Sequence, residues 1–109
     1  MCGILSVIRY DNTLCKSVEK IKRNFEKYNM RGPEQSDFIQ DTDNNLILGF
    51  HRLAINGCDE PTSMQPLILN NLILICNGEI YNHKKLAKLI GRECTTGSDC
   101  EIILHMYEK

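Results

Sequence analysis

The sequence lacks an excess of charge of either sign, and it has no apolar run long enough to cross a membrane. Its 13 lysines and arginines against 14 aspartates and glutamates give a formal net charge of −1. No strong field therefore attracts nucleic acid or an anionic membrane surface. No basic stretch followed by a long apolar segment marks a signal peptide. These absences argue against nucleic-acid and membrane partners and predict a cytoplasmic protein.

Close cysteine pairs of the kind that hold structural zinc are also lacking. The nearest two cysteines, Cys94 and Cys100, have no second pair beside them, so we expect no metal site. In a cytoplasmic protein the thiols stay reduced. Apart from Cys2, they are typical of small, often buried apolar residues; they are Cys15, Cys58, Cys76, Cys94 and Cys100. No glycine-rich phosphate loop, repeat or low-complexity tract is present.

What is present suits one small soluble domain over residues 1–109. Apolar residues make up 42% of the chain and charged residues 25%, which is ordinary for a globular protein. A chain of 109 residues buries a real but modest core, because small domains hide a smaller share of their surface.

The apolar pattern predicts one strand, one helix, several strands and two further helices. A short apolar run predicts a strand over 3–8, and apolar residues three or four apart predict a helix that Thr13 caps and that "RGP" at 31–33 ends. The strands that follow form two hairpins. The first joins 37–41 to 45–53 near Asn44 and Asn45, and the second surrounds Asn70 and Asn71 within 67–76.

A loop over 56–66 separates these hairpins, and two helices complete the chain. Asn82 is placed to cap a helix that runs through Ile90. Ser98 and Glu101 have the spacing of a capping box, which predicts that the last helix begins there.

Cys2 directly follows the initiator methionine. Met1 is removed from chains whose second residue is small, and Cys2 would then carry a thiol and a free α-amine side by side. That combination is a nucleophile with its own base. The alternative interpretation is a disordered thiol at a fraying terminus.

Six motifs in fixed order carry a specific resemblance: "MCGIL", "RGPEQSD", "HRLAI", "QPLILNN", "CNGEIYNH" and "TGSDCEIIL". Together they resemble the glutamine-hydrolysing domain of asparagine synthetase, a class II, N-terminal-nucleophile glutamine amidotransferase. The resemblance implies an α+β fold, the αββα sandwich of the Ntn hydrolases. The family's domain is nearly twice as long, so residues 1–109 would hold only its N-terminal part and be incomplete at the C-terminus.

The resemblance also implies a role for each site residue. Cys2 would attack the side-chain amide of L-glutamine, and Asn77 and Gly78 would stabilise the oxyanion. Arg52 would bind the substrate α-carboxylate, with backbone groups of Leu53 and Ile55 beside it, and Glu79 and Asp99 would bind the α-ammonium group. No histidine is required, so His51, His83 and His105 are expected to be structural or solvent-facing.

Each of these residues also has an ordinary interpretation. "NG" is common in hairpin turns, an arginine often forms a surface ion pair, Glu79 could be a solvated surface residue, and Asp99 could be a favourable charge at a helix N-terminus.

The partners follow from the same resemblance. Ammonia would pass to a synthetase domain or subunit, and ATP and Mg²⁺ are expected only there, so this chain needs no cofactor. A truncated, non-catalytic remnant or docking module of the same family is the alternative, and a thiol or metal protein is a weaker third. Sheets without their neighbours expose apolar faces and unpaired edges, which favours an oligomer.

Overall fold

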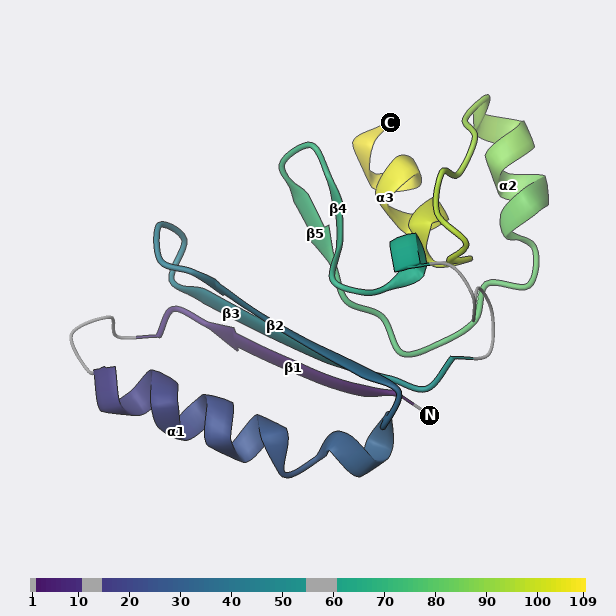
Figure 1. Cartoon of the computed structure of the whole chain (residues 1–109). Helices are drawn as coiled ribbons and strands as arrows, with labels where there is room; N and C mark the ends of the chain where they lie inside the picture. The colour runs from purple at the N-terminus through teal and green to yellow at the C-terminus, as the bar shows by residue number, and fades with distance from the viewer. Residues whose placement is uncertain (1, 11–14, 55–60) are drawn as a thin grey trace.

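The structure is a computed structural model that describes residues 2–10, 15–54 and 61–109. Helices and strands are combined around two separate antiparallel sheets (Figure 1). The elements in order are β1 (Gly3–Ile8), α1 (Cys15–Glu26), η1 (Asn29–Arg31), β2 (Gln35–Asp41), β3 (Leu46–Arg52), η2 (Pro61–Ser63), β4 (Leu67–Leu69), β5 (Leu72–Leu74), α2 (His83–Ile90) and α3 (Glu101–Glu108). This order confirms the sequence prediction.

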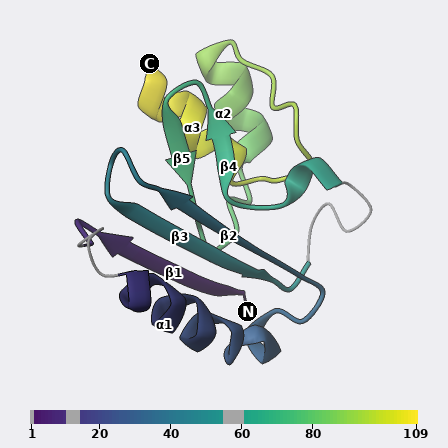
Figure 2. The ribbon, with the colours of Figure 1, turned by 60° about the vertical axis from the view of Figure 1, so that its left-hand side comes forward.

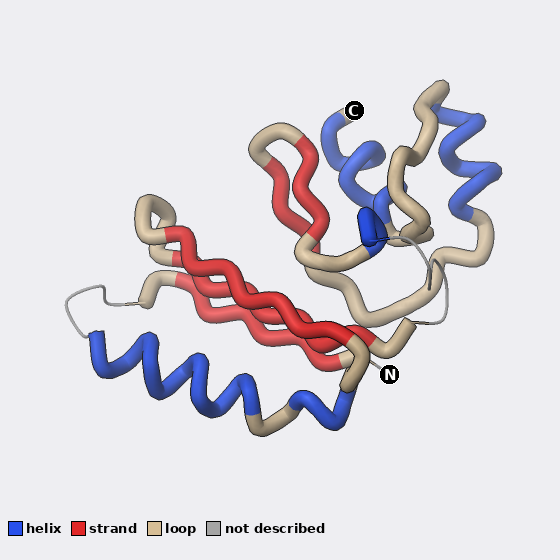
Figure 3. Tube along the Cα trace, in the orientation of Figure 1, coloured by secondary structure: helices blue, strands red, loops and turns tan. Residues whose placement is uncertain are grey.

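The larger sheet has the strand order β1-β3-β2, with both pairings antiparallel. Its long strands contrast with the short β4–β5 hairpin (Figure 3). The hairpin lies on the opposite side of this sheet from α1 in both views (Figures 1 and 2). α3 packs against β5 and α2. The result is a helix, a sheet, a second small sheet and two further helices.

Side-chain alternation along β3 decides what each face of the larger sheet contacts. The face toward α1 carries Gly49 and His51, and the Phe25 ring of α1 stacks on the His51 ring with centroids 3.8 Å apart. A Cβ atom added at Gly49 would lie 2.6 Å from the Phe25 ring, so only glycine lets the helix approach this closely. The opposite face carries Leu48, Phe50 and Arg52, all buried.

His51 is a structural residue, as predicted. Its Nε2 lies 2.8 Å from the Phe25 carbonyl and its Nδ1 lies 2.6 Å from the Ser36 hydroxyl. Both ring nitrogens therefore have partners inside the layer between α1 and the sheet, which satisfies a buried polar side chain.

The β4–β5 hairpin and α3 enclose a second apolar cluster. Leu67, Cys100 and Leu104 are buried at its centre. Asn70 takes φ = 52° at the hairpin turn, a left-handed conformation that asparagine tolerates better than most residues. The predicted hairpin is thus confirmed, although β5 ends at Leu74, before Ile75 and Cys76.

The predicted capping box of the last helix is wrong. α3 begins at Glu101, and the Glu101 carboxylate does not return to the Ser98 backbone. It accepts hydrogen bonds from the backbone N–H groups of Thr95 (2.9 Å) and Thr96 (2.6 Å) and from both threonine hydroxyls. Glu101 is buried, so the threonine loop offers it more donors than the capping box would.

Other boundaries differ in smaller ways. α1 ends at Glu26, so Tyr28 falls outside it, and η1 (Asn29–Arg31) ends at the first residue of the "RGP" segment. Asn82 occupies the N-cap position of α2 but makes no side-chain capping bond. Thr13, the predicted cap of α1, lies outside the described residues. In the described part of the chain, no helix has the length and apolarity needed to span a membrane.

Candidate active site

The Cys2 side chain is held where β1 begins and β3 ends. Pairing of Gly3 with His51 brings Cys2 beside Leu53, which is 51 positions away in the chain. The Leu53 N–H donates to Cys2 Sγ at 3.3 Å, and the Cys2 thiol donates to the Leu53 carbonyl at 3.4 Å. The sheet therefore fixes a terminal thiol that the sequence alone leaves free to fray.

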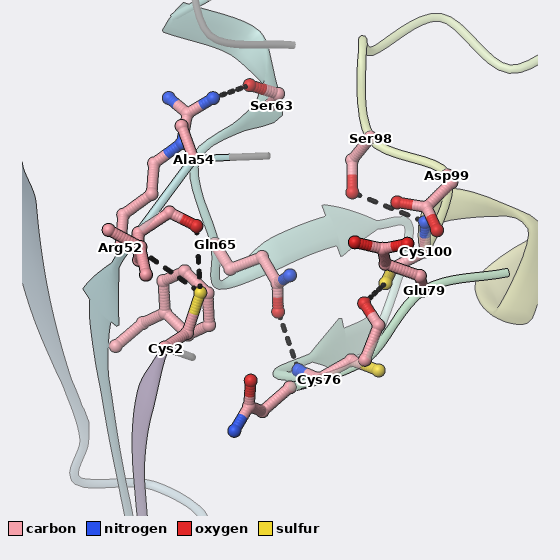
Figure 4. A pocket seen from close by; sticks show the side chains of 14 residues that line it. Cys2, Arg52, Ala54, Ser63, Gln65, Cys76, Glu79, Ser98, Asp99 and Cys100 are labelled. Carbon is pink, nitrogen blue, oxygen red and sulfur yellow. Dashed lines mark hydrogen bonds between the residues drawn. The ribbon is translucent and has the colours of Figure 1, made fainter. Parts of the chain in front are cut away.

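Cys2 opens into a cavity of about 220 Å³ between the two sheets (Figure 4). Every predicted site residue that the structure describes lines it; these are Cys2, Arg52, Leu53, Asn77, Gly78, Glu79 and Asp99. Ile55 lies outside the described residues. The structure thus brings the predicted residues together, while their roles remain predictions.

Arg52 reaches the cavity because it is the last residue of β3 and shares a face with Phe50. Its guanidinium Nη2 donates to the Ser63 hydroxyl at 2.6 Å. Behind it, a Cβ atom at Gly32 would lie 2.3 Å from the His51 carbonyl oxygen. The glycine of "RGP" therefore lets the chain pass directly against the end of β3, and the Glu34 N–H donates to the Arg52 carbonyl at 3.3 Å.

Asn77 and Gly78 follow the β4–β5 hairpin and are exposed at the cavity mouth. The segment is anchored at both ends. The Cys76 N–H donates to the Gln65 side-chain carbonyl at 2.6 Å, and the Cys100 thiol donates to the Gly78 carbonyl at 3.6 Å. "NG" is therefore not the hairpin turn here, since Asn70 and Asn71 supply that turn.

Two carboxylates stand across the cavity from Arg52 (Figure 4). Asp99 is buried and its carboxylate accepts the Ile80 N–H. Glu79 is half-buried, and its carboxylate beside the Tyr81 hydroxyl raises the pKa of Tyr81. A cation on one wall and anions on the other match the two charged ends of an amino acid.

Sequence reasoning missed the buried Ser63 and Gln65, which also line the cavity. Both belong to the segment that was predicted as a plain loop over 56–66. The one available signal was the "QPL" motif containing Gln65.

Among the described residues, Cys94, Glu101 and His105 form the one group of possible metal ligands, within 4.8 Å of one another. Burial raises the pKa of Glu101, but bonds from Thr96, Thr95 and His105 outweigh it and lower that pKa to about 2. Burial and the Glu101 charge raise the pKa of the Cys94 thiol, which disfavours the thiolate that a metal needs. Hydrogen bonds account for the position of the Glu101 carboxylate without an ion, and the absence of a metal site stays a prediction.

Comparison with known proteins defines the class. The family model of the glutamine amidotransferase domain matches residues 1–109. The chain therefore belongs to the glutamine amidotransferase domain family.

The relatives narrow the comparison to glutamine-hydrolysing asparagine synthetases. That of Bos taurus is 40% identical over 116 residues, covering 100% of this chain and 19% of the relative. Asparagine synthetase 1 of Arabidopsis thaliana is 39% identical over 113 residues, covering 100% of this chain and 18% of the relative. A probable asparagine synthetase of Acanthamoeba polyphaga mimivirus is 39% identical over 110 residues, covering 98% of this chain and 20% of the relative. The chain spans about a fifth of the length of these relatives, and the predicted family resemblance is confirmed.

Proposed function

We propose that this chain is the N-terminal part of the glutaminase half of an asparagine synthetase. It would hydrolyse L-glutamine through a thioester on Cys2, releasing glutamate and ammonia. The observation that carries the proposal is the single cavity in which the Cys2 thiol, the Arg52 guanidinium and the carboxylates of Glu79 and Asp99 meet. Each is a group that this reaction requires.

Substrate binding uses the two charged walls. The planar guanidinium of Arg52 pairs with the α-carboxylate through two parallel hydrogen bonds. Glu79 and Asp99 accept the α-ammonium group, and backbone groups of Leu53 and Ile55 lie beside the carboxylate. The side-chain amide then extends toward Cys2 and the Asn77–Gly78 segment.

The reaction begins after removal of Met1 exposes the Cys2 α-amine. The α-amine then acts as the base that takes the proton of the Cys2 thiol. The sulfur attacks the amide carbon, and the side chain of Asn77 and the N–H of Gly78 stabilise the oxyanion. The carbon–nitrogen bond breaks as the amine returns a proton to the leaving ammonia, and water then hydrolyses the thioester to glutamate.

The fold and partners complete the proposal. The succession of α1, two sheets and the α2–α3 pair (Figure 1) is consistent with the N-terminal part of an Ntn-hydrolase αββα sandwich. The ammonia acceptor is a cytoplasmic synthetase domain or subunit, where ATP and Mg²⁺ act, and this chain uses no cofactor. The curated relatives are named for glutamine-hydrolysing asparagine synthesis, which supports this assignment.

Mass spectrometry of the expressed protein tests the nucleophile. We expect loss of Met1, followed by addition of one diazo-ketone analogue of glutamine on Cys2. Excess glutamine should slow that addition, and a Cys2→Ala variant should not react. Retention of Met1 throughout the sample, or equal labelling of Cys76 and Cys94 with Cys2, would contradict the mechanism. The second outcome favours the alternative of a non-catalytic docking module.

A further inference from the structure

The short segment from Ser63 to Gln65 contacts the cavity lining at two places, the Arg52 side chain and the Cys76 backbone. Ser63 ends η2 and Gln65 lies two residues further on. Each is 6% exposed, and each makes a 2.6 Å hydrogen bond, Ser63 to the Arg52 guanidinium and Gln65 to the Cys76 backbone. Their side chains leave the segment toward different parts of the cavity (Figure 4).

We infer that Ser63 and Gln65 are positioning residues for glutamine hydrolysis, Ser63 through Arg52 and Gln65 through the Asn77–Gly78 segment. The inference rests on the proposed function, and it assigns the two residues different kinetic effects.

Ser63 acts on substrate binding. A guanidinium recognises a carboxylate only when its plane faces the carboxylate, because the two hydrogen bonds are parallel. The bond from Arg52 Nη2 to the Ser63 hydroxyl sets the rotation of that plane inside a buried site. The substrate carboxylate has the same charge before and during the reaction. Loss of the Ser63 hydroxyl therefore weakens the binding of the substrate and of the transition state equally. This raises KM and leaves kcat nearly unchanged.

Gln65 acts on the chemical step. β5 ends at Leu74, so strand pairing does not hold Cys76, Asn77 or Gly78 in the described structure. The Gln65 side-chain carbonyl is the acceptor for the Cys76 N–H. It therefore fixes the chain immediately before the two oxyanion donors. Those donors matter most when charge develops on the substrate oxygen, so a misplaced segment lowers kcat more than it changes KM.

Three substitutions separate these effects. Ser63→Ala removes the hydroxyl that accepts the Arg52 Nη2 hydrogen bond. Gln65→Met keeps the length of the side chain but removes the carbonyl, whereas Gln65→Glu keeps an oxygen that accepts the Cys76 N–H. Gln40→Met is the matched control, because the Gln40 amide bonds the Tyr10 hydroxyl and does not line the cavity.

The measurements are glutamate release at varied glutamine concentration and hydrogen exchange of the Cys76 backbone amide and Arg52 guanidinium by NMR. For Gln65→Met we expect Cys76 exchange to rise about tenfold and kcat to fall about tenfold or more, with KM within about twofold. Gln65→Glu should restore kcat to within about threefold of wild type. For Ser63→Ala we expect KM and Arg52 exchange to rise about tenfold, with Cys76 exchange unchanged.

The inference is wrong if the two residues give the same kinetic profile, or if neither exchange rate responds to its own substitution. A wild-type chain that releases no glutamate would contradict the proposed function instead. The two exchange rates would still decide whether Ser63 holds Arg52 and whether Gln65 holds Cys76.

Discussion

Arg52 presents a planar fork of N–H donors, whereas a lysine at this position would present a compact ammonium group. Arg52→Lys keeps the charge but loses the bidentate geometry and the bond to Ser63. We expect glutamine binding to weaken about tenfold or more, since a hydrogen bond to a charged group contributes about 1.5–3 kcal/mol. Calorimetric titration of a Cys2→Ala background measures this directly. Equal glutamine affinity with Arg52 and with the Arg52→Lys substitution in this background would show that Arg52 does not bind the substrate α-carboxylate.

Glu101 makes the stability of the protein depend on pH. Its pKa is about 2 in the folded chain, against an ordinary value of 4.5. A lowered folded pKa stabilises the protein above pH 4.5, and that contribution is lost as pH falls from about 4.5 toward 2. We expect the free energy of unfolding, measured with urea, to fall as the pH is lowered through this window. The fall should be smaller in the Glu101→Gln variant.

Asp41 supplies the control for this prediction. A hydrogen bond with the Asn44 side chain lowers the pKa of Asp41, but Asp41 is only half-buried and Asn44 is exposed, and solvent screens such surface interactions. Asp41→Asn should therefore change the loss of unfolding free energy at low pH less than Glu101→Gln does. Identical pH profiles for wild type and Glu101→Gln would show that the threonine loop does not hold the carboxylate in solution.

The glycine of the "RGP" segment decides how closely η1 and β2 approach the end of β3. Gly32 is in an extended conformation with φ = −157°, so its requirement comes from contact and not from backbone strain. A Cβ atom would lie 2.3 Å from the His51 carbonyl oxygen, and the backbone on both sides must move. We expect Gly32→Ala to destabilise the protein by about 2 kcal/mol or more, in the range of overpacking.

Gly91 is the matched control for that substitution. It ends α2 with φ = 67°, and a Cβ atom there meets nothing within 4 Å. Gly91→Ala should cost about 1 kcal/mol, the strain of a left-handed alanine. Thermal unfolding of both variants compares the two costs. A smaller loss at Gly32 than at Gly91 would mean that the β3 end relaxes freely.

At the scale of the whole molecule, the apolar surface of β1 favours self-association. β1 is an outer strand of its sheet, and Ile4 and Ile8 are 52% and 70% exposed on one face of it. An outer strand with unpaired backbone groups and apolar side chains is a template for pairing with another chain. We expect sedimentation velocity to show oligomers that form more readily as protein concentration rises.

An Ile4→Lys, Ile8→Lys double variant should shift that equilibrium toward monomer. Leu89→Lys is the control, because Leu89 is 79% exposed on α2, away from β1. A wild-type chain that stays monomeric at every concentration tested would contradict self-association through β1.

The elements of this fold were predictable where a local pattern had no strong competitor. The apolar runs around Asn44–Asn45 and Asn70–Asn71 gave both hairpins, because turn residues and flanking strands act over a few positions. The capping box predicted from Ser98 and Glu101 is wrong because the buried Glu101 carboxylate makes five hydrogen bonds to other groups. These groups belong to Thr95, Thr96 and His105. Ser63 and Gln65 escaped prediction because their partners lie 11 positions away in each case.

By itself, the sequence determined the kinds of elements, their order and the chemical groups available, because periodicity, turn chemistry and side-chain type are local properties. Only the tertiary structure decided that the Cys2 thiol contacts Leu53, 51 positions away, and that Arg52 faces Glu79 and Asp99 across one cavity (Figure 4). Those distances depend on how the β3 strand and the hairpin pack against their helices. Burial of apolar surface over the whole molecule drives that packing, and no short motif encodes it.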